Sequence, residues 1–135
     1  MTFAIENDLD IVRARASARE LARNLGLPRS AGAVLAAVIS ELSRNILLYA
    51  KRGEIVLAGL ERGGRRGITV VARDHGKGIP DVPRALRDGY STSGRPGLGL
   101  SGVRRLADDF RIQSGEGAGT TVTVKTWWNG EALHA

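Results

Sequence analysis

Glu41 and Asn45 are the first residues whose types and spacing suggest chemistry. They lie four positions apart in the segment ISELSRNILLYA, and at this spacing two side chains leave the same face of a helix, one turn apart. An amide oxygen can ligate Mg²⁺, which takes most of its other ligands from phosphates and water. A carboxylate beside it can accept a proton from an attacking hydroxyl group. Taken alone, the same spacing also describes an ordinary pair on a helix surface, which is the commoner arrangement.

A second group of polar and glycine residues follows the apolar segment ITVVAR. Asp74 stands at the end of this predicted strand, and Gly76 and Gly78 come shortly after it. The carboxylate could accept a hydrogen bond from an exocyclic amine such as that of adenine, and glycines let the backbone approach a flat ligand. Thr120 begins the last predicted strand, where its hydroxyl group could help to hold the same base. Without such a ligand, the segment from Asp74 to Gly78 is an ordinary turn, and Thr120 is an ordinary strand residue.

A glycine-rich segment, TSGRPGLGLSGV, precedes a predicted helix. Its glycines are Gly94, Gly97 and Gly99. The free N–H groups and the dipole at the start of a helix suit a phosphate group, although the pattern also describes a flexible loop without a ligand. A dinucleotide-binding loop would directly follow the first strand of a βαβ unit. Here the segment follows a polar stretch after a short helix, so we exclude that interpretation.

The pattern of apolar residues predicts the elements that must position these groups. Asp8 can cap the first helix, Gly26 and Pro28 end it, and Gly53 closes the second helix. The basic turn RGGRRG at 62–67 joins two strands into a hairpin. The predicted helices are 9–25, 30–50, 82–87 and 100–109, and the predicted strands are 54–61, 68–73, 110–114 and 120–128.

The composition predicts one globular domain over residues 1–135, with a frayed tail at about 129–135. Apolar residues make up 42% of the chain and charged residues 25%, which is an ordinary globular composition. The predicted helices gather on one face of a mostly antiparallel sheet, so we expect an α+β fold in two layers. The sequence contains no run of about 18 apolar residues, so no membrane span is expected. The acidic N-terminus is unlike a signal peptide.

The composition also excludes several classes of site. The chain has no cysteine and two histidines, so disulfides, thiolate zinc sites and histidine-rich metal sites are not expected. The absence of cysteine leads us to expect a reducing cytoplasm as the location. A formal charge of +6 and a pI of about 10.7 indicate a basic surface. Such a surface either attracts an acidic partner or a nucleotide, or is simply solvated. Aromatic residues, which stack on bases, make up 4% of the chain, so nucleic-acid binding is not expected.

The order and spacing of these segments resemble the N, G1 and G2 boxes of the GHKL ATPases. This superfamily includes gyrase, heat-shock chaperones, histidine kinases and mismatch-repair proteins. The resemblance covers essentially the whole chain and is greatest to the RsbT-type switch kinases of the bacterial stressosome. It implies a two-layer α/β sandwich of the Bergerat ATP-binding type, with a mixed, mostly antiparallel sheet and helices on one face. The matching segments are LDIVRARASARELARNLG, ISELSRNILLYA, ARDHGKGIPD, DGYSTSGRPGLGLSGVRRL and GAGTTV.

The resemblance implies a role for each matching residue. Glu41 would be the general base and Asn45 the ligand of Mg²⁺. Asp74 would contact the adenine amine, with support from Thr120. Arg95 matches in position an arginine that related anti-sigma kinases place near the terminal phosphate. The remaining residues are mostly glycines, which would line the base pocket (Gly76 and Gly78) or form the lid over the phosphates (Gly94, Gly97, Leu98, Gly99 and Leu100).

The resemblance also implies a serine/threonine kinase and regulatory switch that uses ATP and Mg²⁺. Such a kinase would phosphorylate a STAS-domain scaffold or antagonist and, once released, activate a partner phosphatase. The main alternative is an anti-sigma factor kinase that sequesters a sigma factor. Those relatives usually carry a histidine shortly after the asparagine, where this chain has Tyr49. A histidine kinase would need a phosphoacceptor histidine on a dimerising hairpin, which we do not find, and the presence of Glu41 and Asn45 disfavours a non-catalytic adaptor.

Overall fold

The structure is a computed structural model that describes residues 1–79, 81–87, 99–115 and 117–129. The predicted frayed tail therefore lies outside the described residues, except for residue 129. The elements in chain order are β1 (Thr2–Ile5), α1 (Asp8–Asn24), α2 (Arg29–Ala50), β2 (Gly53–Arg62), β3 (Arg65–Asp74), α3 (Val82–Ala85), α4 (Gly99–Leu106), β4 (Asp109–Gly115) and β5 (Gly119–Trp128).

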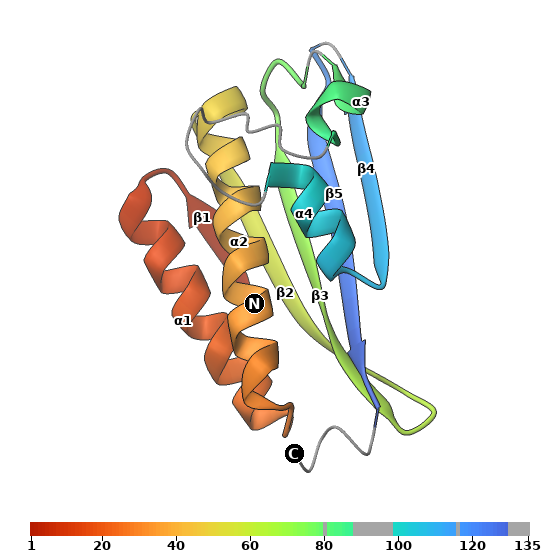
Figure 1. Cartoon of the computed structure of the whole chain (residues 1–135). Coiled ribbons are helices and arrows are strands. Elements are labelled where there is room, and N and C mark those ends of the chain that lie inside the picture. Colours follow the sequence, from red (N-terminus) through yellow and green to blue (C-terminus); the bar gives the residue numbers. More distant parts are fainter. Residues whose placement is uncertain (80, 88–98, 116, 130–135) are drawn as a thin grey trace.

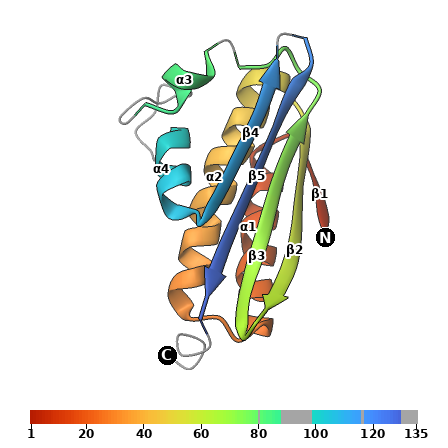
Figure 2. The ribbon, with the colours of Figure 1, turned by 90° about the vertical axis from the view of Figure 1, so that its right-hand side faces the viewer.

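The strands form one sheet in the order β1-β2-β3-β5-β4. β5 enters the sheet between β3 and β4 and runs opposite to both, and all ladders among the described strands are antiparallel. The α+β prediction is confirmed, but the parallel pairing of the implied mixed sheet is absent from these strands. The helices α1, α2 and α4 lie on one face of the sheet (Figure 1). Seen from the side, the strands form one layer and these helices the other (Figure 2).

The long helix α2 forms the centre of the core. Leu35, Ile39 and Leu42 of this helix and Ile55 and Val70 of the sheet are wholly or almost wholly buried in one cluster. By length and composition α2 could cross a membrane, since its most apolar stretch has a mean hydropathy of 1.5, but 56% of that stretch is buried inside the protein. A helix that packs between a sheet and other helices must be apolar around much of its girth. The apolar character of α2 therefore follows from its place in the core.

Asn7 caps α1, so the prediction that Asp8 is the cap is wrong by one residue. The Asn7 side chain accepts a hydrogen bond from the Asp10 backbone N–H at 3.0 Å. The Asp10 carboxylate in turn accepts one from the Glu6 backbone N–H at 2.9 Å. This reciprocal arrangement satisfies two N–H groups at the start of the helix. Asp8 is instead the first helical residue, where its negative charge interacts favourably with the positive end of the helix dipole.

α2 ends at Ala50 as predicted, but the residue that closes it differs from the prediction. Lys51, not Gly53, adopts the left-handed conformation that ends the helix, with φ 68°. Gly53 is the first residue of β2, where an added Cβ atom would collide with the carbonyl oxygen of Arg73 and lie 2.8 Å from Cγ2 of Ile46. The glycine therefore permits a close approach between β2, β3 and the end of α2.

The predicted β2–β3 hairpin is present with a tighter turn than expected. The strands extend to Arg62 and Arg65, and only Gly63 and Gly64, with φ 55° and 77°, form the turn. Two consecutive residues at positive φ suit a two-residue hairpin turn. Most of the basic segment is therefore strand.

A missed strand and two early helix ends also differ from the predictions, since α3 ends at Ala85 rather than at Arg87. The four-residue strand β1, which pairs with β2, was not predicted. α4 ends at Leu106 rather than at Asp109, because Asp109 begins β4 and pairs with Lys125 in β5. The backbone N–H of Asp108 also donates to the Lys125 carbonyl at 2.9 Å, which draws this segment into the sheet.

Candidate functional site

Asp74 lies at the end of β3 and is 7% exposed. It is directly opposite Thr120 of β5 in the register of the sheet. Its Oδ1 atom accepts hydrogen bonds from the backbone N–H groups of Gly76 at 2.9 Å and Thr120 at 3.2 Å. Within the described part of the chain, Oδ2 has no hydrogen-bond partner. The protein thus fixes the carboxylate through Oδ1 alone, and a ligand contact of Asp74 stays a prediction.

The Thr120 side chain is held by Ser114, a residue that sequence reasoning missed. The two hydroxyl oxygens lie 2.8 Å apart, and Ser114 Oγ accepts a hydrogen bond from the Ile79 backbone N–H at 2.8 Å. Ser114 therefore joins β4, β5 and the loop after β3. Its position opposite Thr120 follows from the register of the β4–β5 pair, which no local sequence signal specifies.

Asn45, Asp74 and Thr120 meet around one small cavity between α2 and the sheet. The cavity would hold about one water molecule, which is far less than an adenine ring requires. Ile79 is the lining residue that lies in a loop rather than in a helix or strand, and it is 7% exposed. Nucleotide binding would therefore require this side of the cavity to open. The lining residues are Leu42, Asn45, Ile46, Ala72, Asp74, Ile79, Thr120 and Val122.

Gly76 and Gly78 are required by protein contacts rather than by the cavity, which neither of them lines. A Cβ atom on Gly76 would lie 2.5 Å from the Ala50 Cβ and 2.6 Å from the Tyr49 carbonyl oxygen. Gly78 has φ 84°, and a Cβ atom there would collide with the carbonyl oxygen of Gly115. The loop is therefore packed against the end of α2 on one side and the β4–β5 hairpin on the other. A contact between these glycines and a base stays a prediction.

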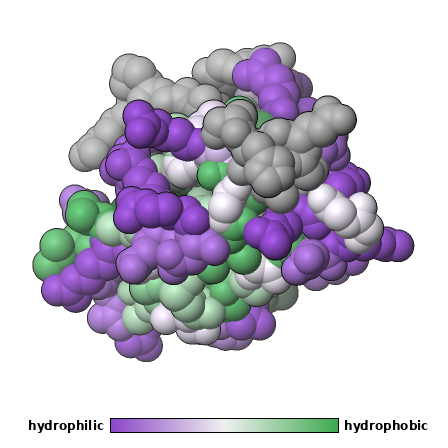
Figure 3. Space-filling model, turned by 90° about the horizontal axis from the view of Figure 1, so that it is seen from below, coloured by the Kyte–Doolittle hydropathy of each residue, from purple (hydrophilic) through white to green (hydrophobic). Residues whose placement is uncertain are grey.

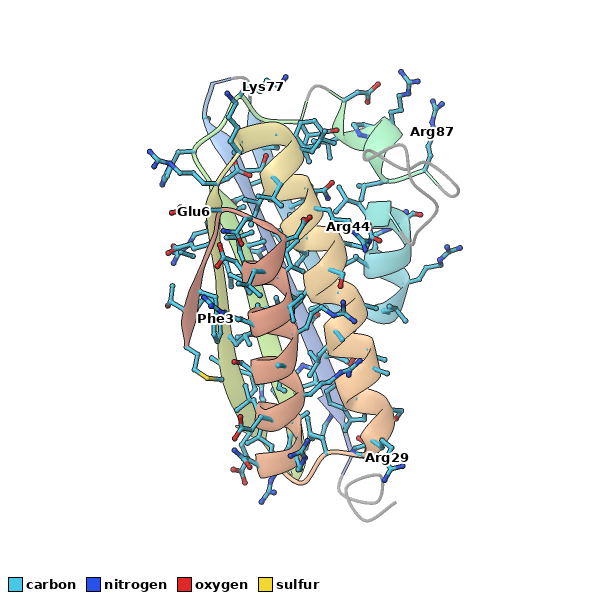
Figure 4. The ribbon with its side chains drawn as sticks, turned by 90° about the vertical axis from the view of Figure 1, so that its left-hand side faces the viewer. Phe3, Glu6, Arg29, Arg44, Lys77 and Arg87 are labelled. Carbon is cyan, nitrogen blue, oxygen red and sulfur yellow. The ribbon has the colours of Figure 1, made fainter. Side chains whose placement is uncertain are left out.

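Glu41 and Asn45 are each 9% exposed and lie one turn apart on α2, as predicted. Asn45 lines the cavity and Glu41 does not. The Glu41 carboxylate instead pairs with the Arg44 guanidinium, with 2.8 Å between Oε1 and Nη1. Arg44 projects from α2 on the side of α4 (Figure 4). Arg44 stands inside the predicted motif, but its spacing alone gave it no role.

The donor set around Asn45 fits Mg²⁺ better than metals that need several protein ligands. Among the described residues, no group of three or more His, Cys, Asp or Glu side chains is placed to hold a metal ion. Mg²⁺ is commonly held by one or two protein oxygens together with substrate phosphates and water. A buried amide one turn from a carboxylate is consistent with such a site.

The predicted lid is described only where it joins α4. Gly94, Arg95, Gly97 and Leu98 lie outside the described residues. Gly99 and Leu100 form the first turn of α4, where Gly99 has φ 64° and Leu100 is 1% exposed. A positive φ favours glycine, and the buried leucine anchors the start of the helix in the core.

Residues 5–126 match the family described as the histidine kinase-like ATPase domain. This chain belongs to the histidine kinase-like ATPase family. Its sequence is 42% identical to the serine/threonine-protein kinase RsbT of Bacillus subtilis (strain 168), over 91% of this chain and 92% of that protein. It is 33% identical to the anti-sigma F factor of Heyndrickxia coagulans, but over only 43% of this chain and 42% of that protein.

Solved structures are similar to the whole of this histidine kinase-like ATPase domain. The structure of the RsbU and RsbW domains of Rv1364c from Mycobacterium tuberculosis gives a TM-score of 0.56 at 25% identity, covering 93% of this chain and 31% of that one. The mycobacterial sensor histidine kinase MprB gives 0.51 at 12% identity, covering 96% of this chain and 97% of that one, which supports the fold alone. The predicted GHKL fold and the resemblance to RsbT are confirmed.

Proposed function

We propose that this protein is an ATP-dependent serine/threonine protein kinase that acts as a partner-switching regulator. The observation that carries the proposal is the meeting of Asn45, Asp74 and Thr120 around one cavity, with Glu41 one turn away on the same helix. Identity of 42% to RsbT over nearly the full length of both chains supports the kinase assignment.

The nucleotide would bind with its base at the sheet end of the cavity. Asp74 Oδ2 would accept a hydrogen bond from the adenine amine, while Oδ1 stays bonded to the Gly76 and Thr120 backbones. The phosphates would lie toward the start of α4, whose N–H groups and dipole favour anions. Asn45 would hold Mg²⁺, which when bound neutralises part of the phosphate charge.

Phosphoryl transfer would then need a positioned acceptor and a base. The oxygen of a substrate hydroxyl group attacks the γ-phosphorus, and the bond from this phosphorus to the β–γ bridging oxygen breaks, so that ADP leaves with the electron pair. The hydroxyl proton passes to the Glu41 carboxylate. Positioning and charge stabilisation supply most of the catalysis in such transfers. Arg44, which lies 2.8 Å from Glu41 Oε1, would keep this carboxylate in place.

The proposed substrate is a serine or threonine of a STAS-domain scaffold or antagonist, in the cytoplasm. Phosphorylation would release the kinase, which would then bind and activate a partner phosphatase. Similarity to RsbT supports this arrangement, as does the likeness to a protein whose described domains are RsbU and RsbW.

An anti-sigma factor kinase is the second candidate. Its support is the 33% identity to an anti-sigma F factor, which covers only 43% of this chain. Tyr49 stands where those relatives usually carry a histidine, and the RsbT match extends over 91% of the chain. A third candidate is a nucleotide-binding adaptor without kinase activity, which the buried Glu41 and Asn45 disfavour.

The test uses the purified protein, γ-labelled ATP, Mg²⁺ and a STAS-domain protein from the same genome. We expect label on a serine or threonine of the STAS protein, and much less with Asn45→Ala. Binding of ATP without any transfer would contradict the kinase proposal and support the adaptor. Stable co-purification with a sigma factor would support the anti-sigma alternative.

A further inference from the structure

A charged hollow lies at the hairpin end of the sheet, away from the candidate nucleotide site. Its volume is about 540 Å³. It combines three cations, two carboxylates and one aromatic ring on the strand face opposite the helices. Its lining residues are Arg62, Gly63, Arg65, Asp108, Asp109, Lys125 and Trp127. Figure 3 views the molecule from this end, where hydrophilic residues cover most of the surface and hydrophobic residues gather in smaller areas.

The three cations of the hollow are available to a partner. Arg62, Arg65 and Lys125 are all exposed. The ion pairs within the described residues join other side chains, Arg44 with Glu41 and Arg73 with Glu54. Arg65 lies over the Trp127 ring, 5.2 Å from its centroid, a contact that an exposed arginine can exchange for a carboxylate at small cost.

One of the two carboxylates is already used by the fold. Asp108 Oδ2 accepts a hydrogen bond from the Trp127 backbone N–H at 2.6 Å. This bond fixes the end of β5 and with it the position of the indole ring. The hollow therefore offers a positioned aromatic surface bordered by cations that form no ion pair within the described residues.

The hollow is separated from the nucleotide site by both face and distance. Thr120 points into the helical layer, and Trp127 lies seven residues further along β5, so its side chain points to the opposite face. At about 3.3 Å per residue, the two positions are roughly 23 Å apart. A segment bound in the hollow would leave the phosphotransfer site open.

We propose that this hollow docks an acidic segment of a protein partner that also carries apolar side chains. Its carboxylates would pair with Arg62, Arg65 and Lys125, and an apolar side chain would lie on Trp127. A nucleic acid fits less well, because one ring provides little stacking for bases. The proposal does not depend on kinase activity.

The test measures binding of a fluorescein-labelled peptide of alternating glutamate and leucine at physiological salt, by fluorescence anisotropy. Replacing Arg62, Arg65 and Lys125 by glutamine should weaken binding about tenfold, the combined effect of three exposed charge pairs. The matched control replaces Arg19, Arg23 and Arg29 by glutamine. These arginines line a second basic hollow of about 560 Å³ between α1 and α2, so both variants lose the same charge.

The proposal is supported if only the first variant loses affinity while Lys125→Gln alone shows a smaller loss of the same kind. Equal losses in both triple variants would mean general charge attraction, and a loss confined to the control would place the site in the second hollow. Either result overturns the proposal. The proposal is also overturned if a single-stranded oligonucleotide binds the parent more tightly than the peptide does and binds the first triple variant more weakly. The substituted side chains are exposed, and thermal melting checks that each variant is folded.

Discussion

At the scale of single residues, the two carboxylate oxygens of Asp74 have different proposed roles, one toward the protein and one toward a ligand. Oδ1 accepts hydrogen bonds from the backbone N–H groups of Gly76 and Thr120, and we propose that Oδ2 binds the adenine amine. Asp74→Asn can keep the first pair of bonds through its amide oxygen but presents a donor to the adenine amine. We expect the affinity for ATP to fall by roughly 1.5–3 kcal/mol, the range for a hydrogen bond to a charged group. Titration calorimetry measures this loss, and thermal melting without nucleotide should be nearly unchanged. Unchanged ATP affinity would remove Asp74 from the site.

Arg44 gives a second prediction at this scale. Its side chain is 41% exposed, so the pair with Glu41 should contribute less than about 1 kcal/mol to stability. Its proposed role is to hold the Glu41 carboxylate, the general base. Arg44→Ala should therefore slow phosphoryl transfer several-fold, with little change in ATP affinity. Arg44→Lys should restore part of the rate. Chemical unfolding and single-turnover kinetics separate the two effects. Transfer at the parental rate in Arg44→Ala would show that the ion pair has no role in phosphoryl transfer.

At the scale of elements, periodicity predicted the long helices and four of the strands. It missed β1 because Thr2–Ile5 is four residues long, too short for alternation to stand out. It misplaced the end of α4 and the residue that caps α2, since these depend on pairing of Asp109 with Lys125 and on Lys51 in a left-handed conformation. Such features depend on tertiary contacts, which a local pattern does not contain.

The candidate site was predicted unevenly for the same reason. Asn45, Asp74 and Thr120 were placed from motif order and do meet around one cavity. Ser114 was missed because its bond to Thr120 depends on strand register, and Ile79 was missed because a loop apolar residue gives no signal of its own. The glycines after β3 were predicted, but their contacts are with protein backbone.

The contact of Gly76 with the end of α2 yields a prediction about stability. A Cβ atom there would lie 2.5 Å from the Ala50 Cβ and 2.6 Å from the Tyr49 carbonyl oxygen. Gly76→Ala should therefore reduce the free energy of unfolding by about 1–3 kcal/mol, the usual cost of overpacking. Gly115→Ala is the matched control, because among the described residues its Cβ would meet only Ala118 Cβ, at 3.6 Å, and we expect a change within about 0.5 kcal/mol. Equal stability of both variants in urea unfolding would contradict the packing described for this loop.

At the scale of the whole molecule, the two proposed binding sites lie on opposite faces of the sheet. The helical face holds the candidate nucleotide site at one end of β3 and β5, and the open face holds the charged hollow at the other end. The excess positive charge of +6 favours encounter with acidic partners generally. The separation allows a partner to be held while its hydroxyl group, on another segment, reaches Glu41.

The most direct test of the central claim is single-turnover phosphorylation of the cognate STAS protein by Glu41→Gln, beside the parent and Asn45→Ala. Glu41→Gln keeps the shape of the side chain and leaves Asn45 in place, so ATP and Mg²⁺ should still bind. Transfer should fall about 10²–10⁴-fold, the usual contribution of a positioned base, and toward the lower end because dissociative transfer asks little of a base. Asn45→Ala should lose both Mg²⁺-dependent binding and transfer. Transfer at the parental rate in Glu41→Gln would show that Glu41 is not the base and would contradict the mechanism proposed for this site.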